Sequence, residues 1–354
     1  MSALSRLIDP KEPLAPERQR FTNAALKAMI VPLVIESVLQ MVVGLADTMM
    51  ASHAGEGVLT GVGLDNLIIT IFIYLFTALS AGGAVVVSQY IGSRDGNNAD
   101  LSASQVFHIA GLLSLACMAL MLLFGSRLLE LMYSTTEPMT MEACKVYMRI
   151  VALSFPANAI YNAGAALYRT MGRTAVTMKV SLAANLVNVA GNAIGIFVLH
   201  AGAAGVAWPT AVSWYVAAAV MTALCFRREQ EVQLDGRKML HLDTAMAKRI
   251  LGVAIPNSVE STLFQAAKVV LGVLIATFGT SQIAANATGQ TFWSLAACMG
   301  TAMSTIFMTV IGQLVGAGDE EAADWYMRKL MRLSFWLALI WNALVMALAP
   351  LLMP

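Results

Sequence analysis

The chain consists of long apolar segments that short polar breaks separate. A helix needs about 20 largely apolar residues to cross a bilayer, and these segments reach or exceed that length. Their apolar residues form continuous runs, unlike the alternation that is typical of membrane barrel strands. We therefore expect an all-α polytopic membrane protein with about nine transmembrane helices, at residues 24–51, 58–91, 104–131, 143–168, 176–199, 203–226, 247–277, 284–315 and 330–350.

The composition favours membrane insertion and excludes several classes of protein. Hydrophobic residues make up 58% of the 354 residues and charged residues 12%, about half the charged share of a soluble domain. The 22 Lys and Arg nearly balance the 21 Asp and Glu, so no basic face is available for nucleic acid. The sequence also lacks a phosphate-binding loop, an HExxH motif and a GxSxG motif. We expect no nucleic acid, no nucleotide, no cofactor and no enzymatic activity.

The four cysteines lie far apart inside apolar segments, with neither a CxxC spacing nor clustered histidines. This pattern is typical of small buried residues and not of a metal site. We expect no metal ion, apart from sodium as a possible coupling ion.

Lysine and arginine are distributed unequally between the two sides of the predicted bundle. Residues 1–21 contain no apolar stretch, so they form a polar tail and not a signal peptide. With this tail inside, eighteen Lys and Arg lie on its side of the membrane and three, Arg127, Lys145 and Arg149, on the other. Because positively charged loops stay in the cytoplasm, we expect a cytoplasmic N-terminus in a bacterial-type inner (plasma) membrane.

The sequence contains an internal repeat at a fixed offset of 224 residues. The matching pairs share residue type: Pro32 and Pro256, Glu36 and Glu260, Ser37 and Ser261, Leu39 and Leu263, Gly55 and Gly279, Thr77 and Thr301, Ala78 and Ala302, Ser80 and Ser304, Gln89 and Gln313, Gly92 and Gly316, Asp95 and Asp319, Ala99 and Ala323, Asp100 and Asp324. Six spans lie within one repeat, so both copies run in the same direction through the membrane.

The repeat and the polar segment RREQEVQLDGRK divide the chain into four parts. We expect a cytoplasmic tail at 1–21, an N-lobe of six spans at 22–226, a cytoplasmic linker at 227–246 and a partial C-lobe of three spans at 247–354. A complete second copy would end near residue 450, at about the length that the offset implies. The sequence is therefore either a truncated one or a natural short form, with half of a pseudo-symmetric C-lobe. The odd number of spans, which breaks the repeat, favours truncation.

Ionisable residues inside the predicted spans are candidates for function, because each costs roughly 2.5–3.5 kcal/mol at the bilayer centre. In the first span Glu36 and Asp47 are eleven residues apart, which places them within about 20° of each other on a helix and roughly 16 Å apart. Gln40 lies on the same stripe. The stripe predicts a polar face toward protein or a water-filled cavity, with Asp47 as a functional carboxylate and Glu36 as functional or as support for a kink at Pro32.

The seventh span repeats Pro256 and Glu260 and adds Lys268. Glu260 and Lys268 are roughly 12 Å apart on a straight helix, so each would need partners on other helices or a shared water-filled cavity. Either a functional pair or a fixed internal ion pair fits this pattern.

The fifth span carries Asn185, Asn188 and Asn192 on one helical face. Their amides could join helices or bind a cation. Among the other polar residues, Asp65 and Asn66 are interpreted as interfacial, and His108 as a core histidine.

Four segments resemble the multidrug and toxic compound extrusion (MATE) family. They are PLVIESVLQMVVGLADTMMASHAGE with its first-span aspartate, QYIGSRDGNNA with its Q-x-x-G-x-x-D turn, YMRIVALSFPANAIYNAGAALYRTMGRT, and IPNSVESTLFQAAKVVLGVLIATFG. The likeness extends over nearly the whole chain from residue 21.

The resemblance implies a proton- or sodium-coupled antiporter that exports small organic, often cationic, compounds by alternating access between two lobes. It also implies that Asp47, Asn188 and Asn192 form the ion site. From their place in the spans we expect Glu36, Gln40, Glu260 and Lys268 to tune the cavity. Asn192 departs from members with a second aspartate at that position. A flippase for a lipid-linked oligosaccharide, of the same superfamily, and a non-transporting membrane scaffold are the alternatives.

Overall fold

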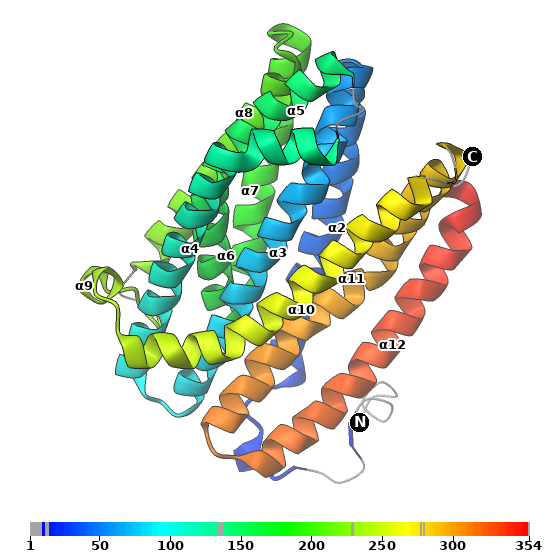
Figure 1. Ribbon diagram of the computed structural model, residues 1–354. Coiled ribbons are helices and arrows are strands. Elements are labelled where there is room, and N and C mark those ends of the chain that lie inside the picture. The colour runs from blue at the N-terminus through cyan, green and yellow to red at the C-terminus, as the bar shows by residue number, and fades with distance from the viewer. Residues whose placement is uncertain are drawn as a thin grey trace.

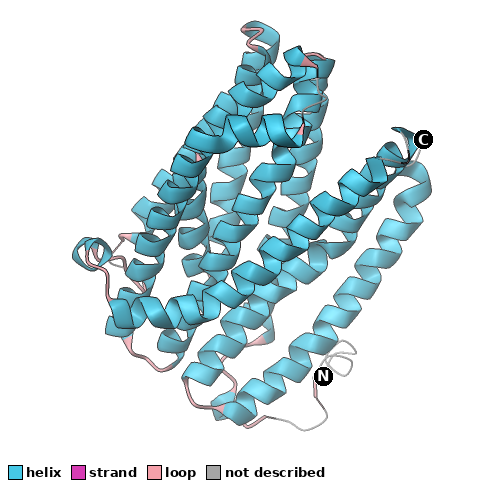
Figure 2. Ribbon diagram, in the orientation of Figure 1, coloured by secondary structure: helices cyan, strands magenta, loops and turns pink. Residues whose placement is uncertain are grey.

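The computed structural model describes residues 9–10, 14–133, 137–227, 230–276, 278 and 280–352. All secondary-structure elements among these described residues are helices, and none is a strand (Figure 2). The elements are the short helix η1 (Pro16–Arg18), α2 (Asn23–His53), α3 (Glu56–Gly92), α4 (Gly96–Met132), α5 (Pro138–Leu153), α6 (Phe155–Thr170), α7 (Thr174–Ala193), the π-helical turn η2 (Ile194–Val198), α8 (Gly202–Cys225), α9 (Gly236–Leu240), α10 (Thr244–Ala276), α11 (Thr280–Gly316) and α12 (Glu320–Leu352).

The prediction of an all-α membrane protein is confirmed, but the number nine is not. Seven helices among the described residues are long and apolar enough to cross a membrane. The bent pair α5 and α6, which meet at 46°, makes an eighth when it is counted as one span. The bend lies next to Pro156, which cannot donate a backbone hydrogen bond. Helix α10 is outside this count, and its apolar sequence is interrupted by Pro256, Glu260 and Lys268.

The helices form two groups, which we call the N-lobe (α2–α8) and the C-lobe (α10–α12). The groups lie against each other at one end and diverge toward the other (Figure 1). Helices α10 and α11 both pack on α3, and α11 also packs on α2. We call the end where α3 ends at Gly92 the joined end, and the opposite end, where α2 ends at His53, the far end.

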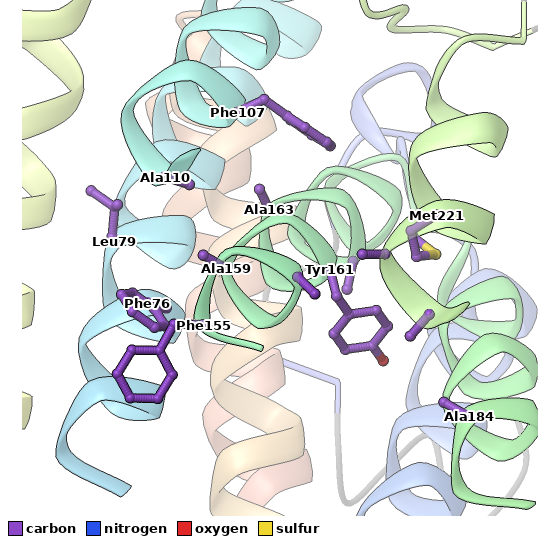
Figure 3. Close-up of a cluster of buried hydrophobic side chains, with 14 of the residues drawn as sticks. Phe76, Leu79, Phe107, Ala110, Phe155, Ala159, Tyr161, Ala163, Ala184 and Met221 are labelled. Carbon is purple, nitrogen blue, oxygen red and sulfur yellow. The ribbon is translucent and has the colours of Figure 1, made fainter. Parts of the chain in front are cut away.

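Large aromatic side chains pack against small residues in the core of the N-lobe (Figure 3). Phe76, Phe107 and Phe155 are buried there beside Ala159 and Ala163. Lipid tails are as apolar as these side chains, so close van der Waals packing, and not the exclusion of water, holds such helices together. Alanines at the contacts let the helix backbones approach closely.

The two lobes touch through glycines at the joined end. A Cβ atom added to Gly92 would lie 1.8 Å from the backbone oxygen of Gln313, and one added to Gly316 would lie 1.9 Å from that of Gln89. Both pairs combine a glycine and a glutamine of the repeat, in reciprocal order. An approximate two-fold axis therefore passes between α3 and α11 here, and only glycine fits at this distance between backbones.

The turns that follow these glycines also repeat. Arg94 and Gly318, 224 residues apart, have positive φ angles of 60° and 71°. Asp95 accepts a hydrogen bond from the backbone N–H of Asn98, and Asp319 accepts one from Ala322, both at 3.1 Å. Each aspartate thus caps the next helix. The Q-x-x-G-x-x-D motif is explained by a helix crossing, a left-handed turn and a helix cap.

The segment between the lobes lies on α4. The buried Gln105 side chain donates to the carbonyls of Lys238 (2.9 Å) and His241 (2.7 Å) and accepts from the N–H of Asp243 (3.1 Å). His108 bonds the Met239 carbonyl through Nδ1 at 2.5 Å. The ring of His108 thus holds this connecting segment, which agrees with the interpretation of His108 as a structural histidine with a satisfied hydrogen bond.

The N-terminal tail packs on the C-lobe. Leu14 is buried against α11 and α12, and Arg18 pairs with Glu321. The Tyr326 hydroxyl accepts from the Phe21 N–H at 3.1 Å and donates to the Phe21 carbonyl at 2.7 Å. The residues just before α2 therefore tie the first helix of the N-lobe to the last helix of the C-lobe.

Candidate functional site

The three predicted ion-site residues, Asp47, Asn188 and Asn192, meet between α2 and α7, near the far end. Asn192 Nδ2 donates to Asp47 Oδ1 at 2.8 Å. With its amide turned so that Oδ1 accepts from Thr210 Oγ1 at 3.2 Å, Asn188 Nδ2 donates to both Asp47 oxygens, at 2.9 and 3.1 Å. Two amide donors thus face one carboxylate, which is the arrangement that compensates a negative charge away from water.

One acceptor in this cluster lacks a hydrogen-bond partner. Asn192 is fully buried, and its Oδ1 receives no hydrogen bond from the described residues. A buried acceptor without a donor is costly unless water or an ion satisfies it. Together with the Asp47 oxygens it offers oxygen atoms of the kind that hard cations prefer. The cluster has the chemistry to hold a proton or a small cation.

Small residues bring the polar side chains of α7 and α8 together. Cβ atoms added to Gly191 and Gly195 would lie 2.7 Å from Pro209 and 2.3 Å from the Gly205 carbonyl oxygen. A G-x-x-x-G spacing of this kind lets two membrane helices approach closely. The π-helical turn η2 starts directly after Asn192 and Ala193, and such turns are frequent at functional sites.

The sequence analysis missed Thr210, which the close contact of α7 and α8 places beside Asn188. Two signals could have found it: the G-x-x-x-G spacing of Gly191 and Gly195, and Pro209 inside an apolar helix. Asn185, predicted on the same face, does not join the cluster, and its Nδ2 is buried without a described partner.

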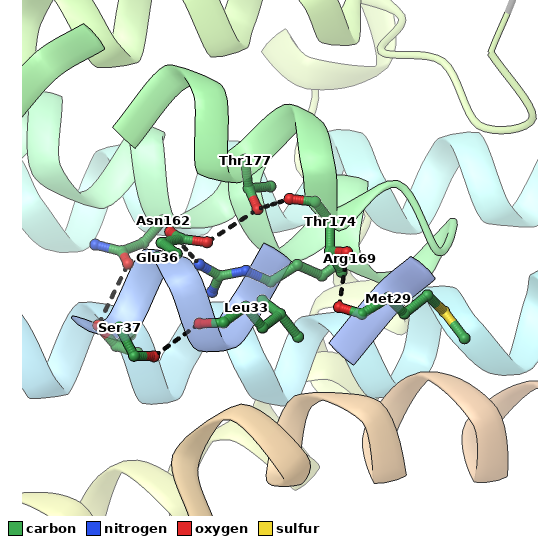
Figure 4. A network of polar contacts seen from close by, with 9 residues as sticks. Met29, Leu33, Glu36, Ser37, Asn162, Arg169, Thr174 and Thr177 are labelled. Atoms are coloured by element: carbon green, nitrogen blue, oxygen red, sulfur yellow. Dashed lines mark hydrogen bonds and ion pairs between the residues drawn. The ribbon is translucent and has the colours of Figure 1, made fainter. Parts of the chain in front are cut away.

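Glu36 is buried toward the joined end, on the same helix as Asp47. Its Oε1 accepts from Arg169 Nη2 at 2.9 Å and its Oε2 from Thr177 Oγ1 at 3.2 Å (Figure 4). Sequence reasoning missed Arg169, which it had placed in a loop. The ion pair with Arg169 links α2 to α6, and the hydrogen bond from Thr177 links α2 to α7.

The other predicted cavity residues do not gather at one site. Gln40 and Glu260 have exposed side chains, and Glu260 has no ion pair within the described residues. Lys268 Nζ lies 3.4 Å from the ring centre of Trp293 and 4.9 Å from that of Phe264. Of the two interpretations of Glu260 and Lys268, the fixed ion pair between them does not form among the described residues.

Asp65 is fully buried within the protein, which its interpretation as an interfacial residue does not predict. Neither carboxyl oxygen has a hydrogen-bond partner among the described residues. It packs near α5 and does not belong to the Asp47 cluster. A carboxyl buried without a partner weakens the fold.

Replacing Asp65 with leucine is expected to stabilise the protein by about 1–3 kcal/mol, because this change removes an unpartnered polar group at nearly equal volume. Asn192→Leu is the matched control: Asn192 is equally buried but donates to Asp47, so its loss should lower stability. Thermal unfolding of the purified chain in detergent measures both changes. A lower melting temperature for Asp65→Leu would contradict the prediction.

No group of three or more His, Cys, Asp or Glu side chains that could hold a metal ion occurs among the described residues. A small cation at the Asp47 cluster would therefore rely on a single carboxylate with amide and hydroxyl oxygens.

Comparisons with known proteins agree with this architecture. The chain is 28% identical over 297 residues to the "Uncharacterized transporter YisQ" of Bacillus subtilis, covering 82% of this chain and 64% of that protein. It is 26% identical over 319 residues to the "Probable multidrug resistance protein NorM" of Thermotoga maritima, covering 88% and 66%. The chain thus spans slightly less than two thirds of the length of these curated relatives.

A solved structure described as a MOP superfamily transporter from Pyrococcus furiosus has the same fold, with a TM-score of 0.85 at 21% identity over 97% of this chain and 75% of that one. The sequence model of the MatE family matches residues 32–194 and 256–353. Because this match includes more than half of the residues, the chain belongs to the MatE family.

Proposed function

We propose that the protein is a multi-pass plasma-membrane antiporter, in which a proton or sodium ion entering the cell drives the export of small organic, often cationic, compounds. The observation that carries the proposal is the Asp47 cluster, where two amide donors face a carboxylate and the buried Asn192 Oδ1 has no hydrogen-bond partner among the described residues. Carboxylates at membrane depth mark ion pathways by default.

The arrangement of the lobes supports alternating access. The lobes touch at the joined end through Gly92 and Gly316 and diverge toward the far end (Figure 1). With the N-terminus inside, as the distribution of Lys and Arg predicts, the joined end faces the cytoplasm. This conformation would be open to the outside, with the Asp47 cluster near the open end.

The names of related proteins support the substrate class. Several are called multidrug resistance or multidrug export proteins, including the NorM protein of Thermotoga maritima and MepA of Staphylococcus haemolyticus. The diverging helices expose aromatic and methionine side chains, such as Phe264, Trp293 and Met49. Aromatic rings attract organic cations, and methionine side chains adapt to ligands of different shape.

Transport by the purified chain in proteoliposomes tests the proposal. A fluorescent organic cation should move against its gradient when a pH or sodium gradient is imposed, and should not move without one. Movement of a lipid-linked oligosaccharide alone would instead identify a flippase, and no movement of either compound would favour a membrane scaffold. Comparing the two gradients separates proton from sodium coupling.

A further inference from the structure

Arg169 links the interior of the N-lobe to the C-lobe. Its side chain pairs with Glu36, which is only 3% exposed (Figure 4). Its backbone carbonyl accepts a hydrogen bond from Thr309 Oγ1 of α11 at 3.0 Å. The carbonyl of the next residue, Thr170, accepts one from Gln313 Nε2 at 2.7 Å.

These carbonyls are available because α6 ends at this point. The last four carbonyls of a helix lack donors from their own helix, and α6 ends at Thr170. Two of them are used by the C-lobe. The direction in which the Arg169 and Thr170 carbonyls point depends on the position of the end of α6. The ion pair between the Arg169 side chain and the buried Glu36 holds that end in place.

The same residues of α11 form the contact between the lobes. The Gln313 side chain donates to the Thr170 carbonyl. The backbone oxygen of Gln313 lies 1.8 Å from the position that a Cβ of Gly92 would take. The end of α6 and the glycine crossing therefore close the joined end together. Glu36 also shares the continuous helix α2 with Asp47, which connects this closure with the candidate ion site.

We propose that Glu36 is a positioning residue for closure of the joined end. By binding the Arg169 side chain, it holds the end of α6 where the carbonyls of Arg169 and Thr170 accept from Thr309 and Gln313. The pair therefore favours the conformation closed at this end over one in which the lobes separate there. This inference rests on the proposed alternating access.

Spin labels on the two lobes test the inference. Ser93 and Glu320 are exposed at the joined end, on the N-lobe and the C-lobe respectively. In a variant of the 354-residue chain whose four native cysteines are replaced by alanine, both positions are changed to cysteine and labelled. Electron–electron resonance in lipid nanodiscs then gives the distribution of distances between the labels.

Glu36→Gln should raise the fraction of molecules with a long distance between the labels about five- to tenfold relative to the parent. This is the shift expected when the closed conformation loses about one hydrogen bond and the separated conformation loses none. Thr309→Val, which removes a contact between lobes without touching Glu36, should shift the distribution in the same direction. Both changes act on the same contact, so the double variant should shift less than the sum of the two.

Ser37→Ala is the matched control, because the Ser37 hydroxyl donates to the Leu33 carbonyl of its own helix (2.9 Å). Its other neighbour, the Cys298 thiol of α11, is already absent from the cysteine-free parent. The substitution should leave the distances unchanged. If Glu36→Gln does not fold, Arg169→Lys replaces it, since lysine keeps the charge but loses the planar fork. A lower melting temperature for Glu36→Gln with an unchanged distance distribution would overturn the inference, because a merely structural pair would give that result.

The labels report conformation whether or not the chain transports. Absence of transport with the expected shift in distances would contradict the antiporter proposal and leave the role of Glu36 intact. Transport with no shift would contradict the role of Glu36 alone.

Discussion

Replacement of Asp47 with asparagine is expected to reduce ion-driven export to the level of protein-free liposomes while the protein still inserts and folds. Asparagine has nearly the same shape, so packing between α2 and α7 should remain. The change removes the only carboxylate of the cluster, however, and an amide can neither take up a proton nor balance the charge of a cation. Without this carboxylate, the cluster no longer distinguishes the two conformations by its affinity for the ion. An ion that binds both conformations equally cannot drive the change between them.

A second measurement checks the same variant without transport. A cation that binds only the folded protein stabilises it by about 2.7 kcal/mol when its concentration is a hundred times its Kd. In the parent, sodium or a lower pH should therefore raise the melting temperature. Asp47→Asn should abolish the rise with sodium and reduce the rise at lower pH, because the buried Asp65 still takes up a proton. Asp65→Asn serves as the control, because Asp65 is a buried carboxyl of the same lobe outside the cluster. Normal export by Asp47→Asn would remove Asp47 from the mechanism.

Replacement of Gly92 with leucine is expected to prevent closure of the joined end and thereby stop transport. The added Cβ would lie 1.8 Å from the Gln313 carbonyl oxygen and 2.8 Å from its Cα. Backbone atoms cannot move aside as a side chain can, so the lobes must separate. Overpacking of this kind costs about 1–3 kcal/mol or more, and 1–3 kcal/mol corresponds to a shift of roughly five- to 150-fold toward the conformation separated at this end.

Gly63→Leu is the matched control for this experiment. Gly63 lies in the same helix, α3, and a Cβ there has nothing within 4 Å. Both changes improve helix propensity equally, so a difference between them reports the contact between lobes. The distance between labels at Ser93 and Glu320 measures the separation. An unchanged distance in Gly92→Leu would show that the crossing tolerates side chains.

Most of the fold could be predicted from the sequence because membrane insertion leaves few alternatives. Each predicted apolar segment coincides with a helix, or with a bent pair in the case of α5 and α6. The offset of 224 was also informative, since Gln89, Gly92 and Asp95 and their counterparts form the same crossing, turn and cap twice. The number of spans was less predictable, because Pro256, Glu260 and Lys268 lower the apolarity of α10.

The candidate site could be predicted only in part. Helical periodicity places Glu36 and Asp47 on one face and Asn188 and Asn192 on another, but it does not say which helices meet. Thr210 joins the cluster through the close contact of α7 and α8. Arg169 reaches Glu36 from the end of α6, where it reads as a loop cation in the sequence. Thr210 and Arg169 come from other helices than the residues that they contact. The periodicity of one span cannot predict contacts that depend on how the helices pack.

The bond between the N-terminal tail and α12 sets the order in which the molecule can be assembled. Phe21 and Tyr326 are 305 positions apart, and at roughly 5–20 residues per second of synthesis the ribosome reaches Tyr326 about 15–60 s after Phe21. The segment at Phe21 must therefore wait for a segment that is synthesised 305 residues later. During this interval Leu14 and Phe21 are exposed on the nascent chain, and a chaperone that shields them would influence the yield of correctly assembled protein without touching the finished fold.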